Sequence, residues 1–325
     1  MIRYVLISLL SFISSSALAQ YTETINSNRP GFSYGAYSVG TNVIQAEMGA
    51  RYANDDHELL SKESDIFNLD YSLRYGLYYE RLEIILDGTY SSENVNLSRG
   101  LSSDKYTNKN FRRNTLGAKY LIYDRYLQKD LEGPNLISWK AENTFQWDDL
   151  IPSVSAYAGA NLLFGENPFM FEDEPFLTPK VGVFTQNNYK NFVLVMNFIA
   201  DKFTTDYPGY EGIFTLTHTI SQDIAVFGEY QFIINDLYSD DLFRFGAGYL
   251  AFEDMQIDGS VMFNLRNTPS RWYVGFGISY RYDDQHKEKR IYENKAEKKD
   301  DERKKEQKKK KKKLNPDIKL EEDQK

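Results

Sequence analysis

The feature that most constrains the fold is an alternation of apolar and polar residues with a period of two. Between 67 and 77, every second position is apolar and the positions between are polar or small. The apolar positions are Phe67, Leu69, Tyr71, Leu73, Tyr75 and Leu77. Because successive side chains of a β-strand point to opposite faces, this pattern predicts a strand with one apolar and one polar face.

The pattern recurs along the chain in segments of similar length. The segments are 43–52, 67–77, 82–90, 114–123, 153–164, 177–185, 192–200, 212–220, 224–234, 242–251, 255–264 and 271–282. A tilted strand needs about 9 to 11 residues to cross a bilayer, which is close to these lengths. The sequence therefore predicts an all-β fold, a transmembrane antiparallel up-and-down β-barrel of about twelve strands.

The predicted connections alternate between short and long. Short turns are expected near 79–81, 186–191, 221–223 and 252–254, and longer loops at 53–65, 91–113, 165–176, 201–211, 235–241 and 265–270. Outer-membrane barrels place short turns in the periplasm and long loops outside the cell. With an even number of strands, both termini are expected in the periplasm.

Two alternatives remain for the strand count. Residues 136–147 fit either a thirteenth strand or a short helix within the 124–152 connection, and the alternation of loop lengths favours the helix. A barrel of fourteen strands would take 29–38 as its first strand, but it would invert the early loops. Twelve strands is therefore the prediction.

Composition agrees with a membrane barrel. Aromatic residues make up 15% of the chain, with 25 Tyr and 21 Phe, whereas the mean hydropathy is only −0.56. Such a balance is expected where alternate residues face lipid and rings gather at both interfaces. The chain has no cysteine, which excludes a disulfide framework and a Cys-ligated metal.

The N-terminus predicts export. Arg3, an apolar stretch at 4–13 and the small residues Ala17 and Ala19 form the pattern of a signal peptide covering 1–19. We expect the mature chain to reach the cell outer membrane. Residues 20–41 are then a periplasmic or plug segment, and 42–283 form the barrel.

The C-terminal segment 284–325 differs in character from the barrel. It is rich in lysine, with an unbroken run from Lys308 to Lys313, and Pro316 follows. We expect a disordered or partly helical periplasmic tail. Contact with an anionic partner is the alternative, and nucleic acid is excluded by the compartment.

Charged side chains share one strand phase, which predicts a charged lumen. Arg or Lys facing lipid near the midplane would cost about 2 to 4 kcal/mol, so these residues are expected to face inward. The candidates are Glu47, Arg51, Asp70, Arg74, Asp87, Lys119, Lys180, Glu229, Arg244, Asp258 and Arg281. They form either ion pairs that fill the barrel or charge rings that select a solute.

Enzymatic chemistry has little support in the sequence. The only histidines are His57, His218 and His286, and none is placed with an expected catalytic or metal-binding partner. We predict no catalytic residue, no metal and no cofactor. An outer-membrane hydrolase would need a nucleophile beside His57 or His218.

Several short motifs resemble those of a known family. Residues 28–33, Asn-Arg-Pro-Gly-Phe-Ser, resemble the "DRPxFS" opening of the outer-membrane transporter family named after the MetA pathway of phenol degradation, with Asn28 in place of Asp. Further likeness lies in 45–47, 78–83, 116–120, 152–155 and 158–159, within an overall span of about 24–283. The resemblance implies a channel-like barrel without catalytic residues. It does not carry phenol over as the solute.

The last predicted strand holds a second resemblance. Gly277, Tyr280 and Tyr282 resemble the signal that the barrel-assembly machinery reads on a terminal strand. The expected partners are therefore this machinery, outer-membrane lipid and an unidentified small solute. The leading hypothesis is a channel or transporter for a small, amphipathic solute. The alternative is a closed structural barrel that anchors the basic tail.

Overall fold

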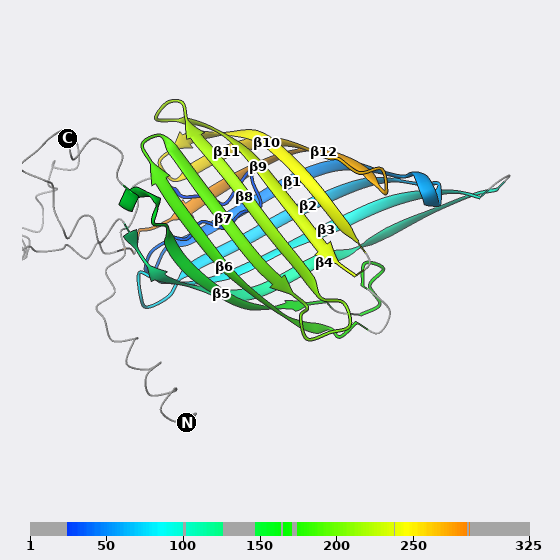
Figure 1. Ribbon diagram of the computed structural model, residues 1–325, viewed down its shortest axis with the longest axis horizontal. Helices are drawn as coiled ribbons and strands as arrows, with labels where there is room; N and C mark the ends of the chain where they lie inside the picture. The colour runs from blue at the N-terminus through cyan, green and yellow to red at the C-terminus, as the bar shows by residue number, and fades with distance from the viewer. Residues whose placement is uncertain are drawn as a thin grey trace, which may run out of the picture. The chain divides into compact units, whose positions relative to one another are not determined.

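The computed structural model describes residues 25–99, 102–125, 147–163, 165–170, 174–236, 238–284 and 286, and these form a closed antiparallel barrel. The strands are β1 (Ile44–His57), β2 (Lys62–Gly76), β3 (Leu82–Arg99), β4 (Ser102–Tyr123), β5 (Ser153–Leu162), β6 (Leu177–Tyr189), β7 (Phe192–Asp201), β8 (Gly209–Thr219), β9 (Ile224–Asn235), β10 (Ser239–Phe252), β11 (Met255–Asn264) and β12 (Ser270–Tyr282). Short 3₁₀ helices, η2 (Glu58–Leu60) and η3 (Trp147–Leu150), lie in two connections. The predicted twelve-stranded barrel is confirmed (Figure 1).

Each strand pairs with its neighbours in sequence, and the first strand pairs with the last. Ile44 lies opposite Tyr282 and Asp56 opposite Ser270, so β1 and β12 join along almost their whole length. Closure gives every strand two hydrogen-bonded neighbours. We call the end with residues 44 and 282 the turn end, and the opposite end, with the β1–β2 and β3–β4 hairpins, the loop end.

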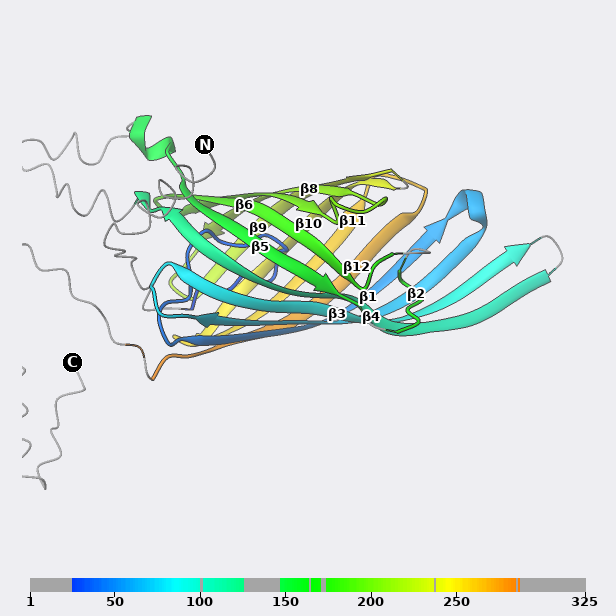
Figure 2. The same cartoon turned by 90° about the horizontal axis from the view of Figure 1, so that it is seen from below.

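Two segments that the sequence predicts as loops are mostly strand. Residues 53–65 and 91–113 were expected as loops, but β1 and β2 continue to His57 and Lys62, and β3 and β4 to Arg99 and Ser102. Both hairpins reach beyond the neighbouring strands (Figure 2). Polar residues occupy both faces of these strand extensions. On the β1–β2 hairpin, for example, the Asn54 side chain donates a hydrogen bond to Asp65. Apolar alternation therefore stops although strand pairing continues.

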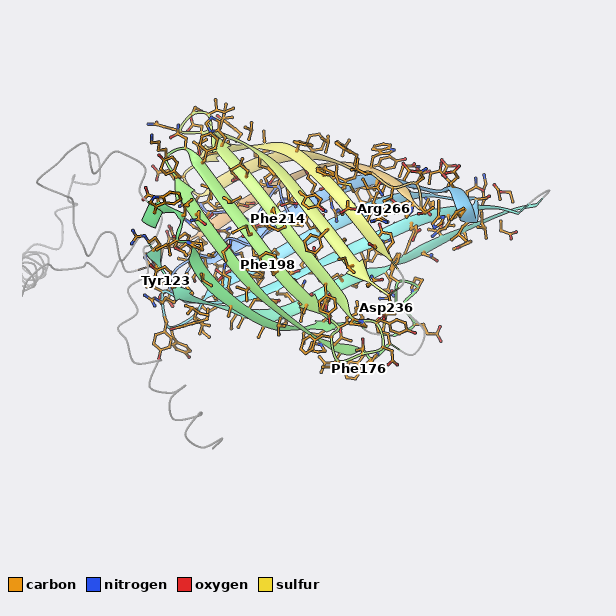
Figure 3. All side chains as sticks on the ribbon, in the orientation of Figure 1. Tyr123, Phe176, Phe198, Phe214, Asp236 and Arg266 are labelled. Atoms are coloured by element: carbon orange, nitrogen blue, oxygen red, sulfur yellow. The ribbon has the colours of Figure 1, made fainter. Side chains whose placement is uncertain are left out.

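The exterior of the barrel is apolar. Phe198 and Phe214 lie on the outer face near mid-barrel (Figure 3), with their rings in edge contact at 5.7 Å. Phe198 remains 47% exposed, and many exterior side chains are similarly open, among them Leu69, Leu86, Val183, Leu216, Phe245, Val261 and Phe276. An apolar exterior around a polar interior is the reverse of a water-soluble protein and is the surface that lipid requires.

The interior holds the N-terminal part of the described chain, residues 25–43, which we call the lumenal segment. It forms no strand, so residues 29–38 are not a first strand as the fourteen-strand alternative required. Ala36 and Val43 are completely buried, and Tyr34, Tyr37 and Val39 nearly so. Figure 2 shows this segment, in dark blue, within the barrel near the turn end.

Some predictions concern residues outside the described ranges. These are the signal peptide at 1–19 and nearly all of the tail at 284–325. Residues 136–146 of the segment 136–147, for which the sequence allowed either a helix or a strand, also lie outside the described ranges. Trp147 begins η3. Among the described residues, no helix has the length and apolar character to cross a membrane.

Candidate functional site

The charged lumen is the candidate functional site. The structure places all eleven candidate charges on the interior face of their strands: Glu47, Arg51, Asp70, Arg74, Asp87, Lys119, Lys180, Glu229, Arg244, Asp258 and Arg281. Arg51 and Asp70 are half-buried and the other nine are buried. Period-two alternation carries each side chain to the same side of the wall.

Near the turn end, three of these charges form one network with Glu83, and Arg281 belongs to a separate ion pair. Arg74 lies 3.1 Å from Glu83 and 3.5 Å from Glu47, and the Lys119 ammonium lies 2.9 Å from Glu83. All four side chains of this network are buried. Buried charges need such pairing, because an isolated ion in the interior carries a large desolvation cost. On β12, Arg281 pairs with Asp254 at 2.7 Å.

The same network holds the lumenal segment. Lys119 Nζ donates to the carbonyl oxygens of Gly35 at 2.7 Å and Tyr37 at 2.8 Å. Glu83 Oε2 accepts from the backbone N–H of Val39 at 2.9 Å, and Arg74 Nη1 donates to the carbonyl of Asn26 at 2.9 Å. These charges therefore satisfy the irregular backbone inside the barrel as well as each other.

The motif at 28–33 lies at the centre of the lumen. Arg29 pairs with Asp258 through two hydrogen bonds, Nε–Oδ2 at 3.1 Å and Nη2–Oδ1 at 3.0 Å. Its guanidinium occupies the space where Gly49 and Gly277 would carry a Cβ. Asn28 Oδ1 accepts from the Gly35 N–H at 3.1 Å. An aspartate at position 28 has a carboxylate oxygen that can accept the same hydrogen bond.

Glu229 is the anchor of the next residues of the motif. Its carboxylate accepts the backbone N–H of Phe32 at 3.0 Å and of Ser33 at 3.3 Å. It also accepts from Thr215 Oγ1 at 2.7 Å and pairs with Arg244 at 2.6 Å. With donors from three directions, the buried carboxylate is saturated.

Two guanidinium groups lie over the Phe32 ring. The Arg244 Cζ atom is 4.3 Å from the ring centroid and the Arg51 Cζ atom 4.9 Å. The Tyr273 ring lies 5.1 Å from Arg51, which also pairs with Asp70. Cations over aromatic faces are attracted by about 1 to 2 kcal/mol when desolvated. Phe32 is therefore held in the middle of the lumen by the wall.

Contacts with the lumenal segment come from every strand of the barrel. The wall residues that bond to it are Glu47, Arg74, Glu83, Lys119, Ser153, Gln186, Asn197, Thr215, Glu229, Asp258 and Ser279, and Arg244 of β10 covers Phe32. The segment thus crosses the whole cross-section.

Cavities lie on both sides of the lumenal segment. A cavity of 460 Å³ lies at the turn end, between the lumenal segment and wall residues such as Val193 and Thr217. A cavity of 340 Å³ lies at the loop end, between Phe32 and residues such as Asp55 and Arg271. A pocket of 70 Å³ shares Arg29 with the first and Phe32 with the second. The lumenal segment therefore separates two larger spaces.

Comparison with known sequences decides the family. A family model described as "Putative MetA-pathway of phenol degradation" matches residues 27–282. The chain belongs to this family. The match of the MetA-pathway family covers the 28–33 motif and all twelve strands, and it confirms the resemblance found in the sequence. No curated protein sequence matches the chain.

Solved structures similar to this MetA-pathway family member include several barrels. The toluene transporter TodX from Pseudomonas putida is 9% identical with a TM-score of 0.43, covering 82% of this chain and 98% of that chain. The transport unit of the autotransporter AIDA-I from Escherichia coli is 9% identical with a TM-score of 0.45, covering 79% and 92%. The KdgM porin in complex with disordered oligogalacturonate is 10% identical with a TM-score of 0.41, covering 72% and 98%.

The histidines have local structural contacts. The His57 Nδ1 atom accepts from the Leu60 N–H at 3.3 Å and caps η2. The His218 ring stacks on Phe192 at 4.4 Å, and His286 Nδ1 lies 2.9 Å from the Thr41 carbonyl. Within the described ranges, no group of His, Asp and Glu is arranged to hold a metal ion.

The sequence predicted both members of pairs such as Arg51–Asp70 and Arg244–Glu229, but it did not predict which lumenal residues the wall charges hold. Arg29 bonds to Asp258 and Phe32 to Glu229, and the signal that pointed to both residues was the 28–33 motif. Arg112 and Arg113 were also missed, because period-two alternation assigns neighbours to opposite faces. The register shifts between Thr89 and Tyr90 of β3, so Arg112 is an extra residue on β4 and the alternation breaks there.

Proposed function

We propose that the protein is an outer-membrane channel for a small, amphipathic solute. The turn end faces the periplasm and the loop end faces the outside, as expected from the short and long connections of such barrels. Lipid surrounds the apolar exterior. Tyr280 and Tyr282 are exposed on the outer face of β12, where the barrel-assembly machinery can reach them.

The observation that carries this proposal is the arrangement of the cavities. Spaces of 460 Å³ and 340 Å³ open toward opposite ends, with the Phe32 region between them. A filled structural barrel has no need of such spaces. The smaller pocket between them has a volume of 70 Å³, which is less than a quarter of either larger cavity. Passage of a solute therefore requires a local displacement of 28–34.

The linings indicate an amphipathic solute. The loop-end cavity combines apolar residues, among them Ile66, Ile233, Leu242 and Met262, with charged side chains at the same surface. Such mixtures of apolar wall and few polar anchors are typical of ligand sites. A fully polar channel would lack the apolar cluster that packs beside Phe32.

Flux through reconstituted protein tests this function. The purified chain in liposomes should admit small single-ring solutes, and deletion of residues 25–40 should raise both flux and ion conductance. Arg266→Glu, at the exposed loop end, is the matched control. Liposomes that stay sealed to every tested solute, with and without 25–40, would contradict the proposal.

A closed structural barrel is the second candidate. The observation in its favour is that the lumenal segment contacts every strand and fills the cross-section. In that case the barrel serves as an anchor for the basic segment 284–325. Deleting 284–325 distinguishes the two roles, because a channel keeps its flux without the tail and an anchor loses its cellular phenotype.

A further inference from the structure

We propose that the loop-end cavity is a binding site for a small organic anion, a carboxylate carried on an apolar body. This inference rests on the proposed channel function and names the solute class that the channel would take up. It is carried by the direction of the charges around the cavity, by unpaired polar atoms in its wall and by an adjacent apolar surface.

A β-bulge brings two neighbouring arginines to this cavity. Tyr90 pairs with Phe111 and Thr89 pairs with Arg113, so Arg112 has no partner position on β3. As a result Arg112 and Arg113 both line the cavity, although regular alternation would turn one of them to the exterior. Bulges commonly re-aim side chains next to functional sites.

Basic groups face the cavity, and most of their acidic partners lie outside its lining. The basic lining residues are Arg51, Arg112, Arg113, Lys202, Arg244 and Arg271, whereas the acidic ones are only Asp55, Asp201 and Glu211. The partners Asp70, Glu93, Asp87, Glu174 and Glu229 do not line it. A solute in the cavity therefore touches six basic side chains and three acidic ones, while five further carboxylates lie behind the basic groups that they pair with. This order of charges favours an anion at contact distance.

Polar atoms without partners point to a ligand. Among the described residues, the Tyr273 hydroxyl and the Nε–H groups of Arg244 and Arg113 are buried and make no hydrogen bond. All three residues line the cavity, and Tyr273 and Arg244 are only 2% and 3% exposed. A buried unpaired donor costs about 1 to 3 kcal/mol, which a bound carboxylate would relieve.

The apolar side of the cavity receives the body of the solute. Ala53, Ile66, Leu242, Met262 and Tyr273 form one buried cluster, with Phe32 and Ile233 packed against it. The cavity volume of 340 Å³ falls within the roughly 300 to 1,000 Å³ of small-ligand sites. A single-ring or short-chain carboxylate fits this combination, whereas a bare inorganic anion would leave the apolar wall unused.

Binding of three probes of similar size tests the charge preference. Benzoate, benzyl alcohol and benzylamine are titrated calorimetrically into the full chain in lipid nanodiscs, with empty nanodiscs as the blank. We expect benzoate to bind at least tenfold more tightly than benzyl alcohol, and benzylamine to show no saturable binding. Equal affinities, or preference for the amine, would overturn the proposal.

Two substitutions test the named residues. Tyr273→Phe removes only an unpaired hydroxyl, so benzoate affinity should fall about threefold while thermal stability holds or rises.

Arg112→Gln removes one charge-assisted contact, so benzoate affinity should fall about tenfold while the affinity for benzyl alcohol stays unchanged. Arg266→Gln is the control, because the exposed Arg266 lies at the same end but pairs with Asp241 outside the cavity. Unchanged benzoate affinity in both variants would also overturn the site.

The outcome separates this site from the channel itself. Saturable benzoate binding without flux in liposomes would leave the site standing and remove the channel. Flux of all three probes without charge preference in binding would leave the channel standing and remove the site.

Discussion

Glu229 on β9 accepts the backbone N–H of Phe32 at 3.0 Å, and this bond ties the lumenal segment to the wall of the barrel. The same carboxylate pairs with Arg244, whose guanidinium lies over the Phe32 ring at 4.3 Å. One buried acid therefore fixes both the position of the peptide and the cation that covers its side chain.

Replacing Glu229 should loosen this arrangement. Glu229→Gln leaves Arg244 without its counter-ion, and removal of one partner of a buried ion pair costs about 3 to 5 kcal/mol. We expect a lower free energy of unfolding and more frequent channel openings in planar bilayers. Glu63→Gln, on the β1–β2 hairpin, is the control. Stability and conductance equal to those of the native chain would show that Glu229 does not hold the segment.

Truncating Phe32 should join the two larger cavities. Phe32→Ala removes the ring that packs against both apolar clusters, at a cost of about 3 to 5 kcal/mol. Despite this loss, flux of a small solute into liposomes should rise. Phe198→Ala, on the outer face, provides the matched control and should leave flux unchanged. A fall in flux for Phe32→Ala would contradict a barrier at this residue.

An alanine at either glycine beside Arg29 should displace the Arg29 guanidinium. A Cβ at Gly49 or Gly277 would collide with the Arg29 guanidinium, so Gly→Ala there should cost about 1 to 3 kcal/mol through overpacking and displacement of the Arg29–Asp258 pair. Urea unfolding in lipid measures this. Gly228→Ala is the control, because its Cβ would meet Phe245 at an ordinary 3.5 Å. Equal effects at both kinds of glycine would refute the packing argument.

The stability lost on placing an arginine on the outer face should depend on its depth in the membrane. Phe214→Arg, at the middle of β8, should lower the free energy of unfolding in lipid by about 2 to 4 kcal/mol. Ile220→Arg, beyond the end of β8 at the turn end, should cost at most about 1 kcal/mol, since the penalty falls toward the interface. If the two variants lose equal stability, the belt around Phe214 does not lie in the membrane core.

The strands could be predicted because their signal is local. In 67–77, alternation alone assigns Leu69 to the exterior and Asp70 to the lumen, and the structure agrees. The extension of β3 to Arg99 could not be predicted, because strands outside the membrane carry polar residues on both faces. Pairing there depends on backbone hydrogen bonds, which leave no pattern of hydropathy.

The contacts inside the lumen could not be predicted from the sequence. Ser27 bonds to Ser279 across 252 positions, and Asn197 to Tyr34 across 163. Such contacts depend on the closed barrel and on an irregular segment without periodicity. Arg112 and Arg113 both face the lumen because β4 has one extra residue opposite β3, and the sequence carries no signal for it. The sequence predicted which wall residues face inward, but not what they hold.

A reversible lock on the lumenal segment tests the central claim most directly. Ser33 Oγ and Thr215 Oγ1 lie 2.8 Å apart, and the chain has no cysteine of its own. Ser33→Cys with Thr215→Cys therefore allows one disulfide between the segment and β8. We predict that the oxidised variant in liposomes blocks solute flux and that reduction restores it, with Ser33→Cys alone unaffected. Equal flux before and after reduction would contradict displacement of this segment as the step that opens the barrel.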